Sequence, residues 1–435
     1  MKRKLSPADV VAIKTMLTDG DTQKKIAKKF GVSRSLVSDI ATGRAHSEDK
    51  KPVIINKRGG QYSVGEAAEA QVLNYEAEII HLKDERLQLK RQLKSAVKSH
   101  GLMEGMVEEL EKVIKPYPKL PFTLPVERGI REDVITEHLV MHISDGHHDQ
   151  VVTPDDTGGL ETYNFPISMR RAEVYVDAVL KWTQQTLNPA FKFPALTILS
   201  YGDHTSGEIH GHTQRSYFRN VFKNSFAIGQ LHALMVRDLA PYFENINVVA
   251  VPGNHGRRSM KKDYHGAHDN WDYMIAEIAR LYCKDLDNVH FTIPNSFSIN
   301  LDINGVGFCV FHGDDIRSQM GIPWYGLQRR QQRITALNSV QGGTRIRYNC
   351  CGHFHTPTSI GSMDGEMLVN GPWVATDAYA YNALGAFTEP TQLLHGVNSK
   401  YGITWRLPVR LRSDNEHRGP KRYKLEDASN IIVPA

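Results

Sequence analysis

The sequence has little cysteine and no long apolar run, and both absences exclude broad classes of protein. Four cysteines in 435 residues do not make the disulfide framework of a small secreted protein. No stretch reaches the roughly 18 apolar residues of a membrane span, so we expect no transmembrane helix and no membrane partner. The N-terminus lacks the apolar segment of a secretory signal, and these features together favour a cytoplasmic location.

Positive charge is concentrated at the start of the chain. Residues 1–60 contain fourteen Lys or Arg and six Asp or Glu, a net charge of +8, whereas the whole chain carries +5. The remaining residues therefore carry −3. A basic segment on a slightly acidic body indicates a module that binds a polyanion, although a solvated basic tail would have the same composition.

Residues 1–45 have the pattern of three short helices. Ser6 and Pro7 mark a helix start and Gly20 its end, and a tight turn at Gly31 separates the next two helices. We interpret this segment as a small all-α helix-turn-helix domain that binds DNA through its last helix, with a module for protein contacts as the alternative. The predicted DNA contacts are basic and hydroxyl side chains: Lys28, Lys29, Arg34, Ser35, Ser38 and Arg44.

A polar linker at residues 46–66 leads to a long predicted helix at residues 67–115. Positions spaced alternately by three and four residues, from Val72 to Ile114, are apolar or aromatic at eleven of thirteen sites. This spacing predicts a coiled coil, and hence a homodimer or larger homo-oligomer. A helix that packs on its own catalytic domain would have the same pattern. Prolines between Pro116 and Pro125 then indicate an extended connector, residues 116–133.

From about residue 134 short apolar segments alternate with helical patterns, which indicates a layered α/β domain at residues 134–380. Predicted helices cover residues 169–187 and 218–241. Residues 381–435 form a predicted C-terminal extension, with a strand within residues 402–411 and a basic, polar end that we expect to be mobile. The segments typical of buried strands are 137–144, 195–200, 246–251, 297–303, 307–312 and 345–353.

Several of these strands end directly in an acidic, amide or imidazole side chain. Glycines beside these side chains allow the tight turns that would direct them above the edge of a sheet. Two neighbouring divalent ions need one bridging carboxylate together with nitrogen and oxygen ligands on each side. The candidate metal ligands are Asp145, His147, Asp203, Asn254, His312, His353 and His355.

Five short motifs in this region resemble those of the calcineurin-like metallophosphoesterase superfamily. In chain order they are Asp145-Gly146-His147, Gly202-Asp203, Gly253-Asn254-His255, His312 and Gly352-His353-Phe354-His355. The resemblance covers roughly residues 134–375. It implies a layered β-sandwich flanked by helices and a phosphoesterase with two divalent metal ions. Mn²⁺ is the expected metal, with Zn²⁺, Fe or Mg²⁺ as alternatives, because sites of mixed nitrogen and oxygen ligands discriminate poorly among such ions.

The resemblance also implies a role for each motif residue. One ion would be bound by Asp145, His147 and His355, and the other by Asn254, His312 and His353. Asp203 would bridge the two ions. A hydroxide shared by the ions would attack phosphorus, and His255 would act as the catalytic residue near the leaving oxygen.

Two positions depart from the pattern of the family. An acidic residue that orients the histidine often follows the third motif, but Gly256 stands there, and Ser206 replaces an acidic or amide residue after the second motif. Residues that could orient His255 instead are Asp149, Asp263 and Asp272. Outside the motifs we interpret His142, His210 and His232 as ordinary hydrogen-bonded core or surface histidines.

Basic side chains near the motifs are candidates to bind substrate phosphates, although a solvated rim is the alternative. They are Arg257, Arg258, His212 and Arg215.

The leading hypothesis for function is a DNA nuclease, a metal-dependent phosphodiesterase that its helix-turn-helix domain targets to DNA. Residues 33–44 also resemble helix-turn-helix domains of phage-encoded nucleases, which implies phage DNA metabolism in the host cytoplasm. One alternative is a phosphomonoesterase for protein or nucleotide with a DNA-targeting module. Another is a DNA-binding scaffold with an inactive metal site.

Overall fold

The computed structural model describes residues 5–42, 79, 81–86, 90, 101–117, 134–209, 215–264, 266–317, 323–341, 345–362 and 365–426. The chain divides into two compact units, Met1–Leu87 and Gln88–Ala435. Each unit is described by itself. No helix among the described residues combines the length and apolar character needed to cross a membrane.

The first unit contains three short helices around a small apolar core. They are α1 (Pro7–Thr18), α2 (Gln23–Phe30) and α3 (Arg34–Ala41). Ser6 and Asp9 form a capping box at the start of α1, and the Ser33 hydroxyl accepts a hydrogen bond at the start of α3. Gly31 ends α2 in the left-handed conformation, which lets α3 turn back onto the core. The predicted helix limits in this unit are therefore observed.

A six-stranded sheet forms the centre of the second unit. Strands β2, β4, β5 and β6 run parallel to one another, while β12 pairs antiparallel with both β2 and β13. In spatial order the strands are β13 (Gly402–Arg410), β12 (Thr391–Asn398), β2 (His138–Ile143), β4 (Ala195–Ser200), β5 (Asn245–Ala250) and β6 (Val289–Thr292).

A five-stranded sheet packs against the first one. Its inner strands β8, β9 and β11 are parallel, and its edge strands β7 and β10 are antiparallel to their neighbours. In spatial order the strands are β10 (Thr358–Ser362), β11 (Gly365–Val369), β9 (Ile346–Cys351), β8 (Val306–Phe311) and β7 (Ser298–Ile303). Two short strands, β1 (Ile135–Thr136) and β3 (Phe191–Lys192), pair separately.

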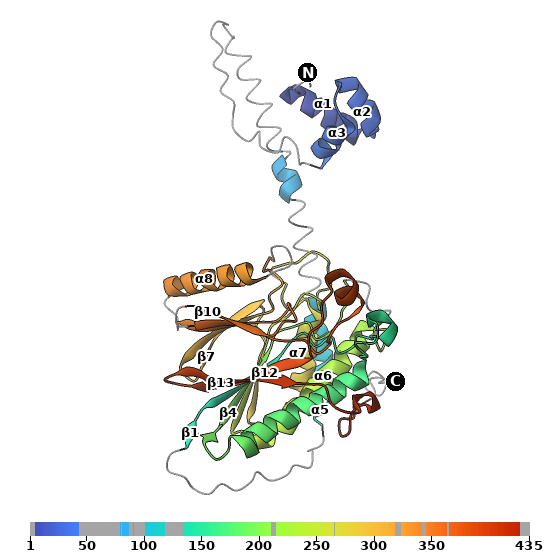
Figure 1. Cartoon of the computed structure of the whole chain (residues 1–435). Coiled ribbons are helices and arrows are strands. Elements are labelled where there is room, and N and C mark those ends of the chain that lie inside the picture. Colours follow the sequence, from blue (N-terminus) through green and yellow to red (C-terminus); the bar gives the residue numbers. More distant parts are fainter. Residues whose placement is uncertain are drawn as a thin grey trace. The chain divides into compact units, whose positions relative to one another are not determined.

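Helices cover the outer face of each sheet, which produces four layers (Figure 1). Helices α5 (Phe165–Lys181), α6 (Val221–Leu239) and α7 (Trp271–Tyr282) share an apolar core with the six-stranded sheet. Helix α8 (Trp324–Gln341) packs on the five-stranded sheet. Side chains of both sheets, among them Val140, Leu199 and Phe308, form the core between the sheets. Short helical segments lie at Pro154–Thr157, Trp182–Thr186, Ala240–Tyr242, Ala380–Leu384 and Glu416–Arg418.

The apolar positions of the predicted coiled coil have two different environments. Residues 101–113 are helical, and the predicted contact positions Met103, Val107 and Leu110 are buried in the core of the second unit. Within this stretch the helix therefore packs on its own domain, which was the alternative. In the first unit the predicted contact positions Ile79 and Leu82 are exposed. Arg86, at another of these positions, is exposed as well, and the remaining positions up to residue 100 lie outside the described residues.

The C-terminal residues are part of the α/β domain and not an extension of it. Strands β12 and β13 belong to the six-stranded sheet, so the boundary predicted at residue 380 is wrong. The end expected to be mobile is packed as far as residue 426. Arg422 forms ion pairs with Asp177 and Asp238, and Tyr423 is buried. Periodicity does not reveal pairing between strands so distant in the chain.

Candidate metal centre

The seven candidate ligands lie in the loops that follow five parallel strands of the two sheets. Asp145 and His147 follow β2, Asp203 follows β4 and Asn254 follows β5 in one sheet. In the other sheet His312 follows β8, and His353 and His355 follow β9. The carboxyl ends of parallel strands meet at one edge of a sheet, a usual place for ligand sites. The fold therefore places residues from positions 145 to 355 beside one another.

Five of the seven side chains are held by a left-handed backbone, which is uncommon for residues other than glycine. Their φ angles are between +38° and +67°. Each such residue costs roughly 1–2 kcal/mol relative to ordinary backbone conformations. This concentration of strain in the ligand loops is typical of functional sites. The residues are Asp145, His147, Asp203, His353 and His355.

Asp203 belongs to two groups of possible metal ligands. The first group consists of Asp203, His147 and His255, and the second of Asp203, His312 and His353. Within each group the ligand atoms all lie within 4.8 Å of one another. One carboxylate oxygen of Asp203 is 2.9 Å from His312 Nε2, and the other accepts the backbone N–H of His255 at 2.7 Å. The carboxylate therefore lies between the two groups, as a bridging ligand requires.

The other candidate ligands extend these two groups. An oxygen of Asp145 is 3.4 Å from His355 Nε2, and the rings of His355 and His147 are 5.4 Å apart between centroids. On the other side, Asn254 Oδ1 is 3.1 Å from His312 Nε2. All seven residues predicted as metal ligands therefore lie close together.

The carboxylates give the centre a negative potential. Burial alone would lower the pKa of His312, but the carboxylates of Asp203 and Asp145 outweigh that effect and raise it to about 10. Burial would raise the pKa of Asp203, but the neighbouring imidazoles of His312 and His255 hold it well below its usual range. For His353, burial and the nearby His312 lower the pKa to about 4. This potential favours a cation beside the carboxylates.

A backbone group contributes to the orientation of His255. Its Nδ1 lies 3.2 Å from the carbonyl oxygen of Ser206. Since a carbonyl oxygen only accepts, Nδ1 carries the proton in this contact. The ring also lies 4.7 Å from that of His147, so His255 adjoins the ligands directly.

Two of the acidic residues considered for that role hold the ligand loops in place. The buried carboxylate of Asp272 accepts the backbone N–H groups of Gly253, Asp203 and His204 at 2.9 to 3.1 Å. Burial and the charge of Asp203 raise the pKa of Asp272 to about 6. Asp149 accepts the N–H of Ser206 at 2.7 Å. These contacts determine where Asp203 and His255 lie.

The predicted substrate-binding side chains have varied environments. Arg258 is engaged in an ion pair with Asp269 at 2.8 Å. The Nε group of Arg257 donates to the Asn254 carbonyl, which keeps this guanidinium beside a candidate ligand. Arg215 is exposed, and His212 lies outside the described residues.

A cavity lined by arginines was not recognised in the sequence. It has a volume of about 570 Å³ and is formed by the segment after His312 and one face of α8. Among the described residues no ion pair is found for Arg317, Arg329 or Arg333, whereas Arg330 pairs with Asp315. The remaining lining residues are Ile316, Tyr325 and Gly326. Three arginines within five positions on α8 were the signal available in the sequence.

Comparison with known proteins gives matches among solved structures alone. No family model matches the sequence, and no curated protein does. An archaeal phosphodiesterase is 11% identical, with a TM-score of 0.29 and coverage of 62% of this chain and 99% of that chain. Vps29 from Entamoeba histolytica, crystallised with Zn²⁺, is 12% identical, with a TM-score of 0.27 and coverage of 62% and 99%. A predicted phosphoesterase from Streptococcus pneumoniae is 9% identical, with a TM-score of 0.26 and coverage of 62% and 98%.

Proposed function

We propose that the protein is a metal-dependent phosphodiesterase with two metal ions that hydrolyses DNA. The observation that carries this proposal is the position of Asp203 between two groups of imidazoles, each close enough to hold one ion. A carboxylate shared by two sets of nitrogen ligands is the arrangement that a two-metal hydrolytic site needs.

The donor set fits two divalent ions of the Mn²⁺ or Zn²⁺ class. Asp145, His147 and His355 would hold one ion, Asn254, His312 and His353 the other, and Asp203 both. The carboxylates of Asp145 and Asp203 are buried, so a cation there would offset the cost of burying their charge. Bound ions of this kind lower the pKa of water and neutralise charge that develops on phosphoryl oxygens.

The protein's own groups would position the substrate and transfer a proton. His255 Nε2 would donate a proton to the leaving oxygen, while the Ser206 carbonyl keeps the ring in position through Nδ1. Hydrogen bonds from three ligand-loop amides to Asp272 hold Asp203 and Asn254 in place during this step. Such preorganisation avoids the cost of reorienting dipoles during the reaction.

The arginine-lined cavity supports a substrate with more than one phosphate. None of its lining residues is a candidate metal ligand, so these arginines would bind a phosphate other than the one that is attacked. Asp315 is three residues after His312, a reach of at most roughly 11 Å along the chain. Tyr325 in this lining is 64% exposed and offers a surface on which a base can stack. A polynucleotide supplies both a second phosphate and a base.

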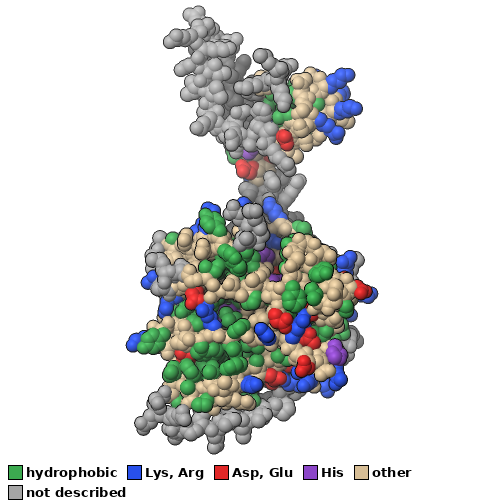
Figure 2. Space-filling view, in the orientation of Figure 1, with side chains coloured by type: hydrophobic (Ala, Val, Ile, Leu, Met, Phe, Trp, Pro, Cys, Tyr) green, Lys and Arg blue, Asp and Glu red, His purple; other side chains and the backbone are tan. Residues whose placement is uncertain are grey.

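The N-terminal unit would deliver this activity to DNA. Arg34 and Ser35 are exposed at the start of α3, and Lys28 and Lys29 are exposed on α2. Figure 2 shows Lys and Arg side chains gathered on the surface of this unit. Ser38, further along α3, is half-buried, and Arg44 lies outside the described residues. Exposed Ile79 and Leu82 would provide an apolar contact for a second copy, which suits a helix-turn-helix reading paired half-sites.

A second candidate function is hydrolysis of phosphomonoesters. It is favoured by one observation, namely that four arginines line one cavity of about 570 Å³. A terminal phosphate on a protein or nucleotide would fit such a cavity. In this case the N-terminal unit would serve for targeting alone.

Hydrolysis assays with purified protein and Mn²⁺ distinguish the two functions. The substrates are single- and double-stranded DNA, bis-p-nitrophenyl phosphate and p-nitrophenyl phosphate. We expect cleavage of DNA and of the diester, abolished by EDTA and reduced roughly 10²–10⁴-fold in His255→Ala. His290→Ala, which removes an exposed histidine of β6, is the matched control. Cleavage of the monoester with intact DNA would reject the nuclease and favour the second candidate.

A further variant tests the role of the cavity. Arg329→Ala combined with Arg333→Ala should raise KM for DNA and leave kcat/KM for bis-p-nitrophenyl phosphate unchanged, because the small diester has no second phosphate. An equal loss with both substrates would show that these arginines act at the metal centre instead.

A further inference from the structure

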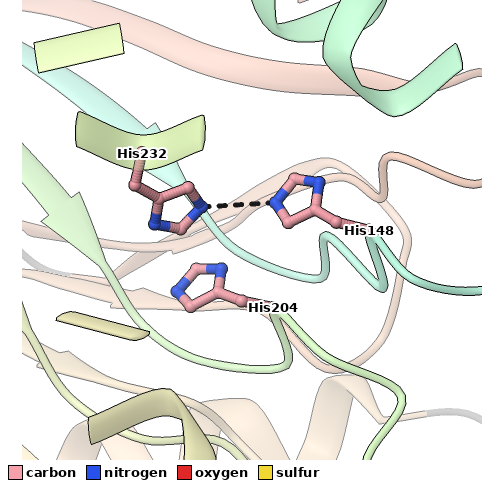
Figure 3. A group of neighbouring side chains, drawn as sticks. All are labelled: His148, His204 and His232. Atoms are coloured by element: carbon pink, nitrogen blue, oxygen red, sulfur yellow. Dashed lines mark hydrogen bonds between the residues drawn. The ribbon is translucent and has the colours of Figure 1, made fainter. Parts of the chain in front are cut away.

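Three more histidines form a separate buried cluster, two of them next to candidate metal ligands in the chain. His148 and His204 directly follow the candidate ligands His147 and Asp203 in the chain, and His232 lies in the middle of α6. One ring nitrogen from each histidine lies within 4.8 Å of those of the other two. All three side chains are buried. Figure 3 shows the three rings converging on one space.

The ring nitrogens divide into an outer set and an inner set. His148 Nδ1 is 2.6 Å from the Ser168 hydroxyl, and His204 Nε2 is 2.7 Å from the Ser200 hydroxyl. This leaves His148 Nε2 and His204 Nδ1 on the inner side, together with His232 Nε2. Metal-binding histidines usually have this arrangement, with the second ring nitrogen held by a polar group.

The inner nitrogens are poorly satisfied by hydrogen bonds. His204 Nδ1 is buried and has no hydrogen-bond partner among the described residues. His148 Nε2 and His232 Nε2 are 3.3 Å apart, longer than the roughly 3.0 Å typical of an N–H donor. Two nitrogens that bind one tetrahedral Zn²⁺ at about 2.0–2.1 Å are themselves about 3.3–3.4 Å apart. The observed separation therefore matches two corners of a metal tetrahedron.

We propose that His148, His204 and His232 form a third metal site, which takes one divalent ion of the Zn²⁺ class and is distinct from the two-metal centre. Three neutral imidazoles with no carboxylate suit Zn²⁺, Cu²⁺ or Ni²⁺ better than Mg²⁺ or Ca²⁺. His232 is buried, as expected of a core histidine, and the proposal adds a role in metal binding.

The position of the cluster gives the site a structural role. The loops after β2 and β4 already contact each other through His147 N–H to Asp203 O at 3.0 Å and His148 N–H to His204 O at 2.9 Å. An ion held by His148 and His204 would join these loops to α6 through His232. The ion would then restrain the two loops that carry His147 and Asp203.

Metal counting on the full-length chain tests this site. Protein loaded with Zn²⁺ is freed of loose metal by gel filtration, and bound zinc is measured by inductively coupled plasma mass spectrometry. We expect His232→Gln to bind one equivalent less than the wild type. His395→Gln is the matched control, since His395 is fully buried and its ring nitrogens have no hydrogen-bond partner among the described residues. It should bind as much zinc as the wild type. A folded His232→Gln variant with unchanged zinc content would overturn the proposal.

A measurement on the unmodified protein covers the case in which that variant does not fold. Crystals of the zinc-loaded wild type should give an anomalous-scattering peak between the three rings. Density without such a peak there would overturn the proposal, whatever the occupancy of the two-metal centre. Since neither readout depends on catalysis, failure of the proposed phosphodiesterase activity would leave this test intact.

Discussion

Replacing Gly202 with alanine tests how closely two ligand loops approach each other. Gly202 has a φ of +86°, and a Cβ there would lie 2.0 Å from the backbone nitrogen of Gly253. An ordinary contact begins at about 3.4 Å, so the loops would have to separate by roughly 1.4 Å. Metal sites tolerate deviations of about 0.2 Å in ligand distance. We therefore expect Gly202→Ala to lose metal binding because Asp203 and Asn254 adjoin the two colliding glycines.

A second glycine serves as the control for the energetic cost of the left-handed backbone conformation without a steric clash. Gly305 has a φ of +80°, but a Cβ there would meet nothing within 4 Å. Gly305→Ala should therefore cost only the roughly 1–2 kcal/mol of the left-handed conformation. Gly202→Ala should cost a further 1–3 kcal/mol, approximately, because backbone atoms cannot move aside cheaply.

Urea unfolding with EDTA measures the stability of each variant without metal, and calorimetric titration with Mn²⁺ measures metal binding. Equal stability of the two variants, together with normal metal binding by Gly202→Ala, would refute the reasoning.

Three further predictions concern the stability of the second unit. Arg171→Met should destabilise the protein by about 3–5 kcal/mol in urea unfolding, because it leaves buried Glu161 without this partner, and adding Glu161→Gln should recover part of that loss. Burial lowers the pKa of His142 to about 3, so below pH 6.5 the unfolded chain binds a proton that the folded chain does not bind. Lowering the pH from 7 to 5 should therefore destabilise the wild type by about 2 kcal/mol more than His142→Gln, measured in the presence of EDTA. Met103→Ala should cost roughly 2–5 kcal/mol, whereas Leu102→Ala, at a 50% exposed position, should change stability by less than about 0.5 kcal/mol.

The candidate ligands could be found from the sequence because each one lies at a junction that has a local pattern. Short apolar segments predicted strands β2, β4, β5, β8 and β9, and these occur within one or two residues of the predicted limits. The candidate ligand that follows each of these segments is therefore expected in the loop at the carboxyl end of a strand. The meeting of these strand ends follows from the parallel arrangement of the strands, and this is why positions from 145 to 355 converge.

The parts that were missed depend on contacts between distant segments. His232 lies within a helix, 84 residues from His148, and nothing in its neighbourhood marks it as different from a core histidine. The Ser206 carbonyl that orients His255 is a backbone group, which no residue type identifies. The apolar spacing at residues 101–114 is the same for a helix that packs on its own domain as for a coiled coil, so periodicity could not distinguish them.

The pairing of β12 with β2 has a consequence for synthesis of the protein on the ribosome. Strand β2 leads into the loop of Asp145 and His147, yet its neighbour on one side is made roughly 250 residues later. Until β12 emerges, one edge of β2 has no partner, and such an edge can pair with other chains. Premature termination before residue 391 would leave this edge open permanently. Translation that stalls after His355 but before Thr391 therefore yields a chain that contains every candidate ligand but has an aggregation-prone sheet.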